Sequence, residues 1–160
     1  MAKIGIIGSG NVGANIAFFL AEKNVADVML YDVQEGLSTG KALDMMEAAP
    51  IRGYLTKLSG TDSIEDILDA EILIITAGSV RKPGMKREDL FTENRVIIDD
   101  IASKLGSYPG IVILVSEPVD FLTTAFIKAS GLSVKRVMGL GGFLDSTRLR
   151  YLIAKELSVS

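Results

Sequence analysis

The feature that most constrains the fold is a set of three glycines that joins an apolar segment to a helical one. The segment "KIGIIG" (residues 3–8) is rich in isoleucine, as expected of a strand buried on both faces of a sheet. The segment "NVGANIAFFLAEKN" follows with the apolar spacing of a helix. Gly8, Gly10 and Gly13 stand between and within these segments in the pattern G-x-G-x-x-G. The pattern predicts a tight turn from a strand into a closely packed helix.

Apolar segments alternate with helical patterns along the rest of the chain. We expect further strands at residues 27–32, 54–60, 71–78, 110–116 and 136–140, and helices at residues 36–49, 63–70, 87–105, 118–130 and 144–157. Pro50 is expected to end the second of these helices. The alternation predicts an α/β fold with one doubly wound parallel sheet.

An aspartate completes the glycine pattern. Asp32 ends the second expected strand, 19 residues after Gly13, where an acid that binds a ribose is expected. We expect a dinucleotide to contact Gly8, Ser9, Gly10, Asn11, Val12, Gly13 and Asp32. Asp32 would accept hydrogen bonds from ribose hydroxyls and repel a 2′-phosphate, which favours NAD over NADP. Residues 1–160 would then form a single dinucleotide-binding Rossmann domain, with strand order 3-2-1-4-5-6. The alternative is a structural turn with a surface aspartate.

Composition narrows the possible functions. The chain has 160 residues, a formal net charge of -3 and no broad basic face, which argues against a nucleic-acid partner. It has no cysteine and no histidine, so we expect no disulfide, no thiolate chemistry and no metal site. No apolar run approaches the roughly 20 residues of a membrane span, and the first ten residues are too short for a signal peptide. We therefore expect a cytoplasmic protein that does not bind membranes.

A cationic loop follows the fourth expected strand. The loop "SVRKPGMKREDL" (residues 79–90) contains Arg81, Lys82, Lys86 and Arg87. In open α/β sheets, ligands bind at the carboxyl ends of the strands, and a Pro-Gly pair suits a mobile lid. Arg81 and Arg87 could hold the two ends of a small dianion. A solvated basic turn, with Arg87 beginning a helix, explains the spacing equally well.

An ordered set of motifs extends these observations. The segments "GSGNVG", "AGSVRKPGMKREDL", "VSEPVD" and "LDSTRLR", together with Asp32, resemble the lactate/malate dehydrogenases. The similarity runs over essentially the whole chain, as the nucleotide-binding half of such an enzyme, and lies closest to the lactate-dehydrogenase-like NAD-dependent malate dehydrogenases. The resemblance implies hydride transfer between malate or oxaloacetate and NAD, with a dicarboxylate substrate.

The resemblance also implies roles for the substrate-binding residues. Arg81 would pair with the second carboxylate of the substrate, where lactate dehydrogenases usually have glutamine, and Arg87 would polarise the carbonyl. Arg148 would bind the first carboxylate, and Asp145 would orient a catalytic histidine. Without the resemblance, Asp145 and Arg148 form a surface ion pair on one helical face.

Further cofactor contacts follow from the same resemblance. Asn94 matches a family asparagine near the nicotinamide. The sequence pattern alone gives this helix residue no special role. Val115, Ser116 and Glu117 would contact NAD through their main chain. The helix at residues 36–49 matches one that the family uses in subunit contacts.

Two features depart from the family. Its acid/base histidine lies beyond residue 160, and this chain has no histidine, so Asp145 would orient nothing. We therefore expect a chain that lacks the C-terminal catalytic domain and is not competent alone, and whose bare apolar face is met by that domain or by a second copy. Glu117 stands where the family usually has asparagine; if ionised it would weaken oxaloacetate binding, and if neutral it could donate a hydrogen bond.

Two other functions stay open. One is a stand-alone NAD-binding or redox-sensing module without catalysis, which the absent histidine favours and the three arginines disfavour. The other is a fragment of a lactate-type 2-hydroxy acid dehydrogenase, which Arg81 disfavours.

Overall fold

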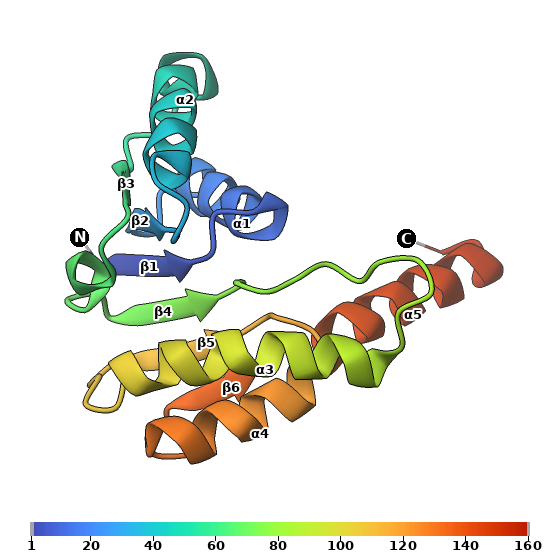
Figure 1. The fold of residues 1–160 in the computed structure, drawn as a ribbon. Helices are drawn as coiled ribbons and strands as arrows, with labels where there is room; N and C mark the ends of the chain where they lie inside the picture. Colours follow the sequence, from blue (N-terminus) through green and yellow to red (C-terminus); the bar gives the residue numbers. More distant parts are fainter. Residues whose placement is uncertain (1, 160) are drawn as a thin grey trace.

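Six parallel strands form one sheet. The structure is a computed structural model that describes residues 2–159. The strands are β1 (Lys3–Ile7), β2 (Asp27–Tyr31), β3 (Leu58–Thr61), β4 (Ile72–Ile75), β5 (Ile111–Leu114) and β6 (Val137–Gly139). They lie in the order β3-β2-β1-β4-β5-β6, and every pair of neighbours is parallel (Figure 1). The predicted doubly wound sheet and its strand order are confirmed.

Helices cover both faces of this sheet. The elements between the strands are α1 (Asn11–Glu22), α2 (Leu37–Arg52), the short 3₁₀ helix η1 (Ile64–Ile67), α3 (Arg87–Lys104) and α4 (Val119–Ser130). Figure 1 shows α1 and α2 on one side of the sheet and α3 and α4 on the other. Two separate cores result: Ile4 and Ile6 of β1 pack toward α1 and α2, whereas Ile7 packs toward α3 and α4. Burial on both faces explains why β1 reads as a continuous apolar run.

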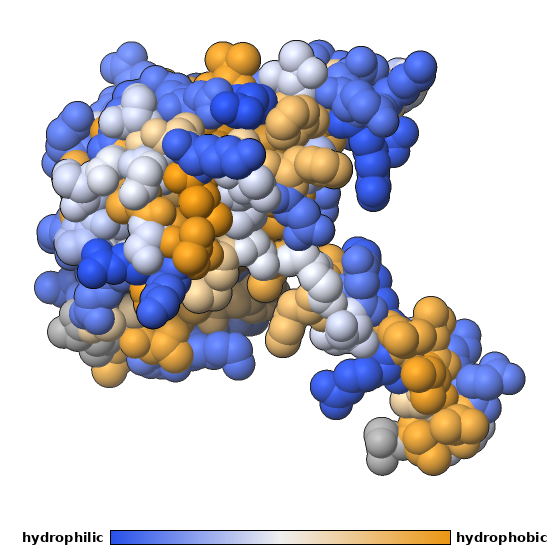
Figure 2. Space-filling view, turned by 90° about the horizontal axis from the view of Figure 1, so that it is seen from below, coloured by the Kyte–Doolittle hydropathy of each residue, from blue (hydrophilic) through white to orange (hydrophobic). Residues whose placement is uncertain are grey.

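The last helix, α5 (Gly142–Leu157), stands apart from both cores. None of its residues is buried. It projects beyond the sheet in Figure 1, and in Figure 2 apolar side chains mark the projecting part. The sequence predicted this helix, but it has no core to pack against within residues 2–159.

The expected end of α2 at Pro50 is wrong. The helix continues to Arg52, with Pro50 inside its last turn. Proline has no N–H and so removes one hydrogen bond from the helix. Pro50 lies two residues before the end of α2, so only the last residues of the helix are affected. Gly53 then ends it, with a φ of 76° and its N–H bonded to the Ala49 carbonyl at 2.8 Å.

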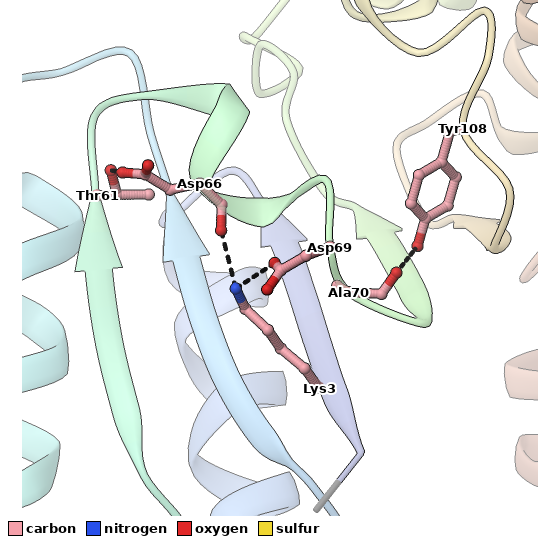
Figure 3. Close-up of polar contacts among 6 residues, drawn as sticks. All are labelled: Lys3, Thr61, Asp66, Asp69, Ala70 and Tyr108. Carbon is pink, nitrogen blue, oxygen red and sulfur yellow. Dashed lines mark hydrogen bonds and ion pairs between the residues drawn. The ribbon is translucent and has the colours of Figure 1, made fainter.

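Side-chain contacts link the segments that lie at the amino ends of the parallel strands. Lys3 donates to the Asp66 carbonyl at 2.9 Å and pairs with the Asp69 carboxylate, which ties η1 to β1 (Figure 3). The Tyr108 hydroxyl donates to the Ala70 carbonyl at 2.6 Å. Burial raises the pKa of Tyr108 to about 12, so this hydroxyl keeps its proton. Most of the residues expected to bind ligands lie at the other end of the strands, after their carboxyl ends.

Candidate functional site

The glycine loop between β1 and α1 is tightly packed on one side and open on the other. A Cβ atom on Gly13 would lie 1.9 Å from the Gly8 carbonyl oxygen and 2.7 Å from Thr76 Oγ1. Gly8 has a φ of 102°, a backbone conformation that favours glycine. A Cβ atom on Gly10 would meet nothing within 4 Å. The loop therefore packs against β4 and leaves open space at Gly10, where α1 begins with unpaired N–H groups.

Thr76, which sequence analysis missed, secures this loop. Its hydroxyl lies at the end of β4 and donates to the Gly8 carbonyl at 2.9 Å. The contact joins residues 68 positions apart in the chain. Its only signal in the sequence is its place directly after an apolar strand.

Asp32 lies at the carboxyl end of β2 and holds the same loop. Its Oδ2 accepts from the Ser9 N–H at 2.6 Å, and its Oδ1 accepts from the Gln34 N–H at 3.0 Å. Ser9 is fully buried. The carboxylate thus supports the glycine loop from the end of β2.

Asp32 borders a hollow of about 560 Å³. Gly8 and Gly10 line it from the glycine loop, and apolar side chains of α3 line its other wall. These apolar residues are Val96, Ile97 and Ile101. Apolar side chains and a carboxylate in one hollow suit a nucleoside, whose base is apolar on its faces and whose ribose carries hydroxyls.

A second hollow, of about 350 Å³, adjoins the first. The two share Thr76, Gly78 and Ser79, so they lie side by side at the carboxyl ends of the strands. The second hollow gathers predicted site residues from four parts of the chain: Val12, Arg81, Arg87, Asn94, Val115, Ser116 and Glu117. The structure thus brings these residues together around one hollow.

Asn94 fixes the wall of this second hollow. It is buried, and its Oδ1 accepts from the Ser79 N–H at 2.6 Å. Its Nδ2 donates to the Glu117 carbonyl at 2.7 Å. The Ser116 hydroxyl donates to the Ala77 carbonyl at 2.7 Å. These bonds tie the loop after β4 to the loop after β5, and give Asn94 a structural role that its pattern did not indicate.

The cationic loop provides two exposed guanidinium groups. Arg81 folds back, with its Nε donating to the Met85 carbonyl at 2.9 Å. Arg87 is the first residue of α3 and is also exposed. Glu117, exposed in the same hollow, adds one carboxylate to the two cations. Two guanidinium groups beside one carboxylate still favour an anionic ligand.

Asp145 and Arg148 do not join this site. Arg148 Nη1 donates to Asp145 Oδ1 at 3.1 Å, and both side chains are exposed on α5. Neither residue lines either hollow. Their roles toward a substrate and a histidine stay predictions.

Two kinds of feature are absent from residues 2–159. No helix in this range is long and apolar enough to cross a membrane. In the same range, no group of three or more histidine, cysteine, aspartate or glutamate side chains is placed to hold a metal ion.

Known proteins resemble this chain in sequence. Residues 2–139 match the NAD-binding domain of the lactate/malate dehydrogenases as a family. A malate dehydrogenase of Ehrlichia canis is 46% identical over 160 residues, and one of Thermoplasma volcanium is 47% identical over 165 residues. Each match covers 99% of this chain and 51% of the relative, so the chain spans about half the length of these relatives.

Solved structures agree with these matches. The malate dehydrogenase of Cryptosporidium parvum has a TM-score of 0.94 at 37% identity. The lactate dehydrogenase of that organism, complexed with lactic acid and β-nicotinamide adenine dinucleotide, has a TM-score of 0.93 at 38% identity. Both cover 99% of this chain and 51% of their own. The protein therefore belongs to the lactate/malate dehydrogenase family, and residues 2–139 are its NAD-binding domain.

Proposed function

We propose that residues 1–160 act as the single dinucleotide-binding domain of a malate dehydrogenase, which transfers hydride between malate or oxaloacetate and NAD. The observation that carries this proposal is the pair of adjoining hollows. One has the carboxylate of Asp32, and the other has Arg81 and Arg87. A ligand that binds along both would have its nucleoside at Asp32 and its reactive end beside the two arginines.

The residues present fit NAD. The open side of Gly10 leaves room for a pyrophosphate beside the first N–H groups of α1. Bound NAD supplies a hydride acceptor. The chain would supply the contacts along NAD. Asp32 would bind the ribose and the glycine loop the phosphates, while Asn94 and residues 115–117 would lie at the nicotinamide end.

The two arginines support a dicarboxylate substrate. Arg81 would pair with the distal carboxylate, and Arg87 would stabilise negative charge on the reacting oxygen. A lactate-type activity is the second candidate, because a lactate dehydrogenase is among the structural matches. Arg81 favours malate over lactate, since lactate has no second carboxylate to pair with it.

Oxidation of the alcohol also releases a proton, which a base must accept. The chain contains no histidine, the commonest base in such reactions. We assign this step to a base in a catalytic region outside residues 1–160. From within the present chain, Asp145 would orient that base and Arg148 would bind the first carboxylate of the substrate. A stand-alone NAD-binding module would need neither residue.

A fluorescence titration with NADH tests the proposal. We expect saturable binding to the 160-residue protein, tighter for NADH than for NADPH, and tightened further by oxaloacetate. Lactate or pyruvate should not produce the same tightening. Binding that is indifferent to oxaloacetate would favour the nucleotide-binding module, and stronger tightening by pyruvate would favour the lactate-type enzyme.

Replacement of Glu117 by asparagine should strengthen the effect of oxaloacetate. The change removes a carboxylate from the hollow that holds Arg81 and Arg87. We expect oxaloacetate to bind the NADH complex about fivefold more tightly, the size of one like-charge contact in a wet site. Glu117→Gln serves as the control that removes charge but keeps length. If neither variant binds oxaloacetate more tightly, Glu117 does not repel the substrate.

The exposed apolar side chains of α5 should make the 160-residue protein self-associate or bind a hydrophobic dye. The exposed residues of this helix include Phe143, Leu144, Leu149, Leu152 and Leu157. Apolar surface of this extent marks an interface, which we assign to the catalytic region or to a second copy. Light scattering and dye fluorescence measure it, with Leu149→Ser/Leu152→Ser as the comparison. A monomer that binds no dye would contradict the assignment.

A further inference from the structure

Lys41 of α2 reaches across to the glycine loop. Its ammonium group donates to the Ser9 carbonyl at 2.5 Å, a contact between residues 32 positions apart. The side chain is half-buried and also lines a hollow between α1 and α2. Neither the glycine pattern nor the position of Asp32 indicates this lysine, because it comes from the second turn of the next helix.

Lys41 and Asp32 hold Ser9 from two sides. The Ser9 N–H donates to the Asp32 carboxylate at 2.6 Å, while its carbonyl accepts from Lys41. Two successive peptide groups of the loop are thereby fixed. The loop then continues into Gly10 and α1 with the first N–H groups of the helix facing open space.

Lys41 shares its hollow with the Asp44 carboxylate but does not pair with it. Among residues 2–159 it forms no salt bridge with a carboxylate. The first turn of α1 contains no acidic residue. None of the residues that line the Asp32 hollow is a lysine or an arginine. Lys41 therefore places a positive charge in direct contact with the glycine loop.

We infer that Lys41 is a positioning residue for the pyrophosphate of a dinucleotide. It fixes the loop peptides whose neighbours donate to the phosphates, and its charge stabilises their negative charge through the loop. This inference rests on the proposed NAD binding, and goes further by assigning phosphate recognition to a residue of α2.

The test compares ligands with and without phosphates. Binding of NADH, ADP-ribose and adenosine is measured by calorimetry for wild type, Lys41→Met and Lys41→Arg, at low and high salt. We expect Lys41→Met to bind NADH and ADP-ribose about tenfold more weakly, with adenosine changed less than about twofold. Its affinity for ADP-ribose should also depend less on salt. Lys41→Arg should keep most of the affinity, because arginine also donates to a carbonyl.

A matched control separates this effect from a general loss of charge. Lys128 is exposed on α4 and forms no salt bridge among the described residues, so Lys128→Met should leave all three affinities unchanged. Equal weakening of adenosine and ADP-ribose by Lys41→Met would show a purely structural role and overturn the inference. Unchanged affinity for ADP-ribose would also overturn it.

The same titrations distinguish a failure of the proposed function. A wild-type protein that binds ADP-ribose but not NADH would contradict the dehydrogenase function, while the Lys41 variants would still decide the inference. A wild-type protein that binds neither ligand would overturn both.

Discussion

Replacement of Gly13 by alanine should abolish NADH binding and strongly destabilise the domain. The new Cβ atom would lie 1.9 Å from the Gly8 carbonyl oxygen, which is backbone and cannot rotate away. Relief of this clash requires α1 to move off β1, and with it the loop that Thr76 and Asp32 hold in place. We expect a loss of about 3 kcal/mol or more in the free energy of unfolding, at the upper end of overpacking costs. Urea unfolding and an NADH titration measure the two effects.

Gly40→Ala is the matched control for this substitution. Gly40 lies inside α2, and a Cβ atom there would meet nothing within 4 Å. Alanine at an unstrained helical position should stabilise the domain by about 0.5–1 kcal/mol, because it favours the helix over the unfolded chain. If Gly13→Ala has the same free energy of unfolding and the same affinity for NADH as Gly40→Ala, the close packing of Gly13 contributes to neither.

The sequence predicted those features that arise from local patterns. The strands β1, β4 and β5 read as nearly continuous apolar runs because helices cover both faces, and this pattern is visible without any tertiary contact. Gly8 and Gly13 were predicted for the same reason, since a tight strand–helix turn requires them wherever it occurs. Pro50 shows the limit of a local rule, because its cost depends on how far the helix must continue.

The contacts that sequence analysis missed act between distant elements, whether or not the residue itself was predicted. Thr76 and Lys41 reach the glycine loop from β4 and α2, and Asn94 joins the loops after β4 and β5. Nothing in the local sequence of a threonine, a lysine or an asparagine specifies such a partner. The same holds for α5, whose amphipathic pattern predicts a helix but not the surface against which it packs.

Replacement of Asp32 by alanine should weaken NADH binding about tenfold and reduce the preference of the protein for NADH over NADPH. The change removes the acceptor for the ribose hydroxyls and the charge that repels a 2′-phosphate. The structure adds a second reason: the Ser9 N–H, now at 2.6 Å from the carboxylate, would lose its partner inside a buried loop. NADH and NADPH titrations measure the preference, and thermal unfolding measures the loss of loop support.

Asp32→Asn separates these two contributions. Its amide oxygen can still accept from the buried Ser9 N–H, and only the bond from the exposed Gln34 is lost. The loop should therefore stay supported, while the charge that disfavours NADPH is gone. We expect Asp32→Asn to unfold like the wild type and to narrow the preference by improving NADPH binding. Asp32→Ala should narrow it mainly by weakening NADH binding, at a lower unfolding temperature. Unchanged affinity of both variants for both cofactors would remove Asp32 from the ribose site and leave it only the loop contact with Ser9.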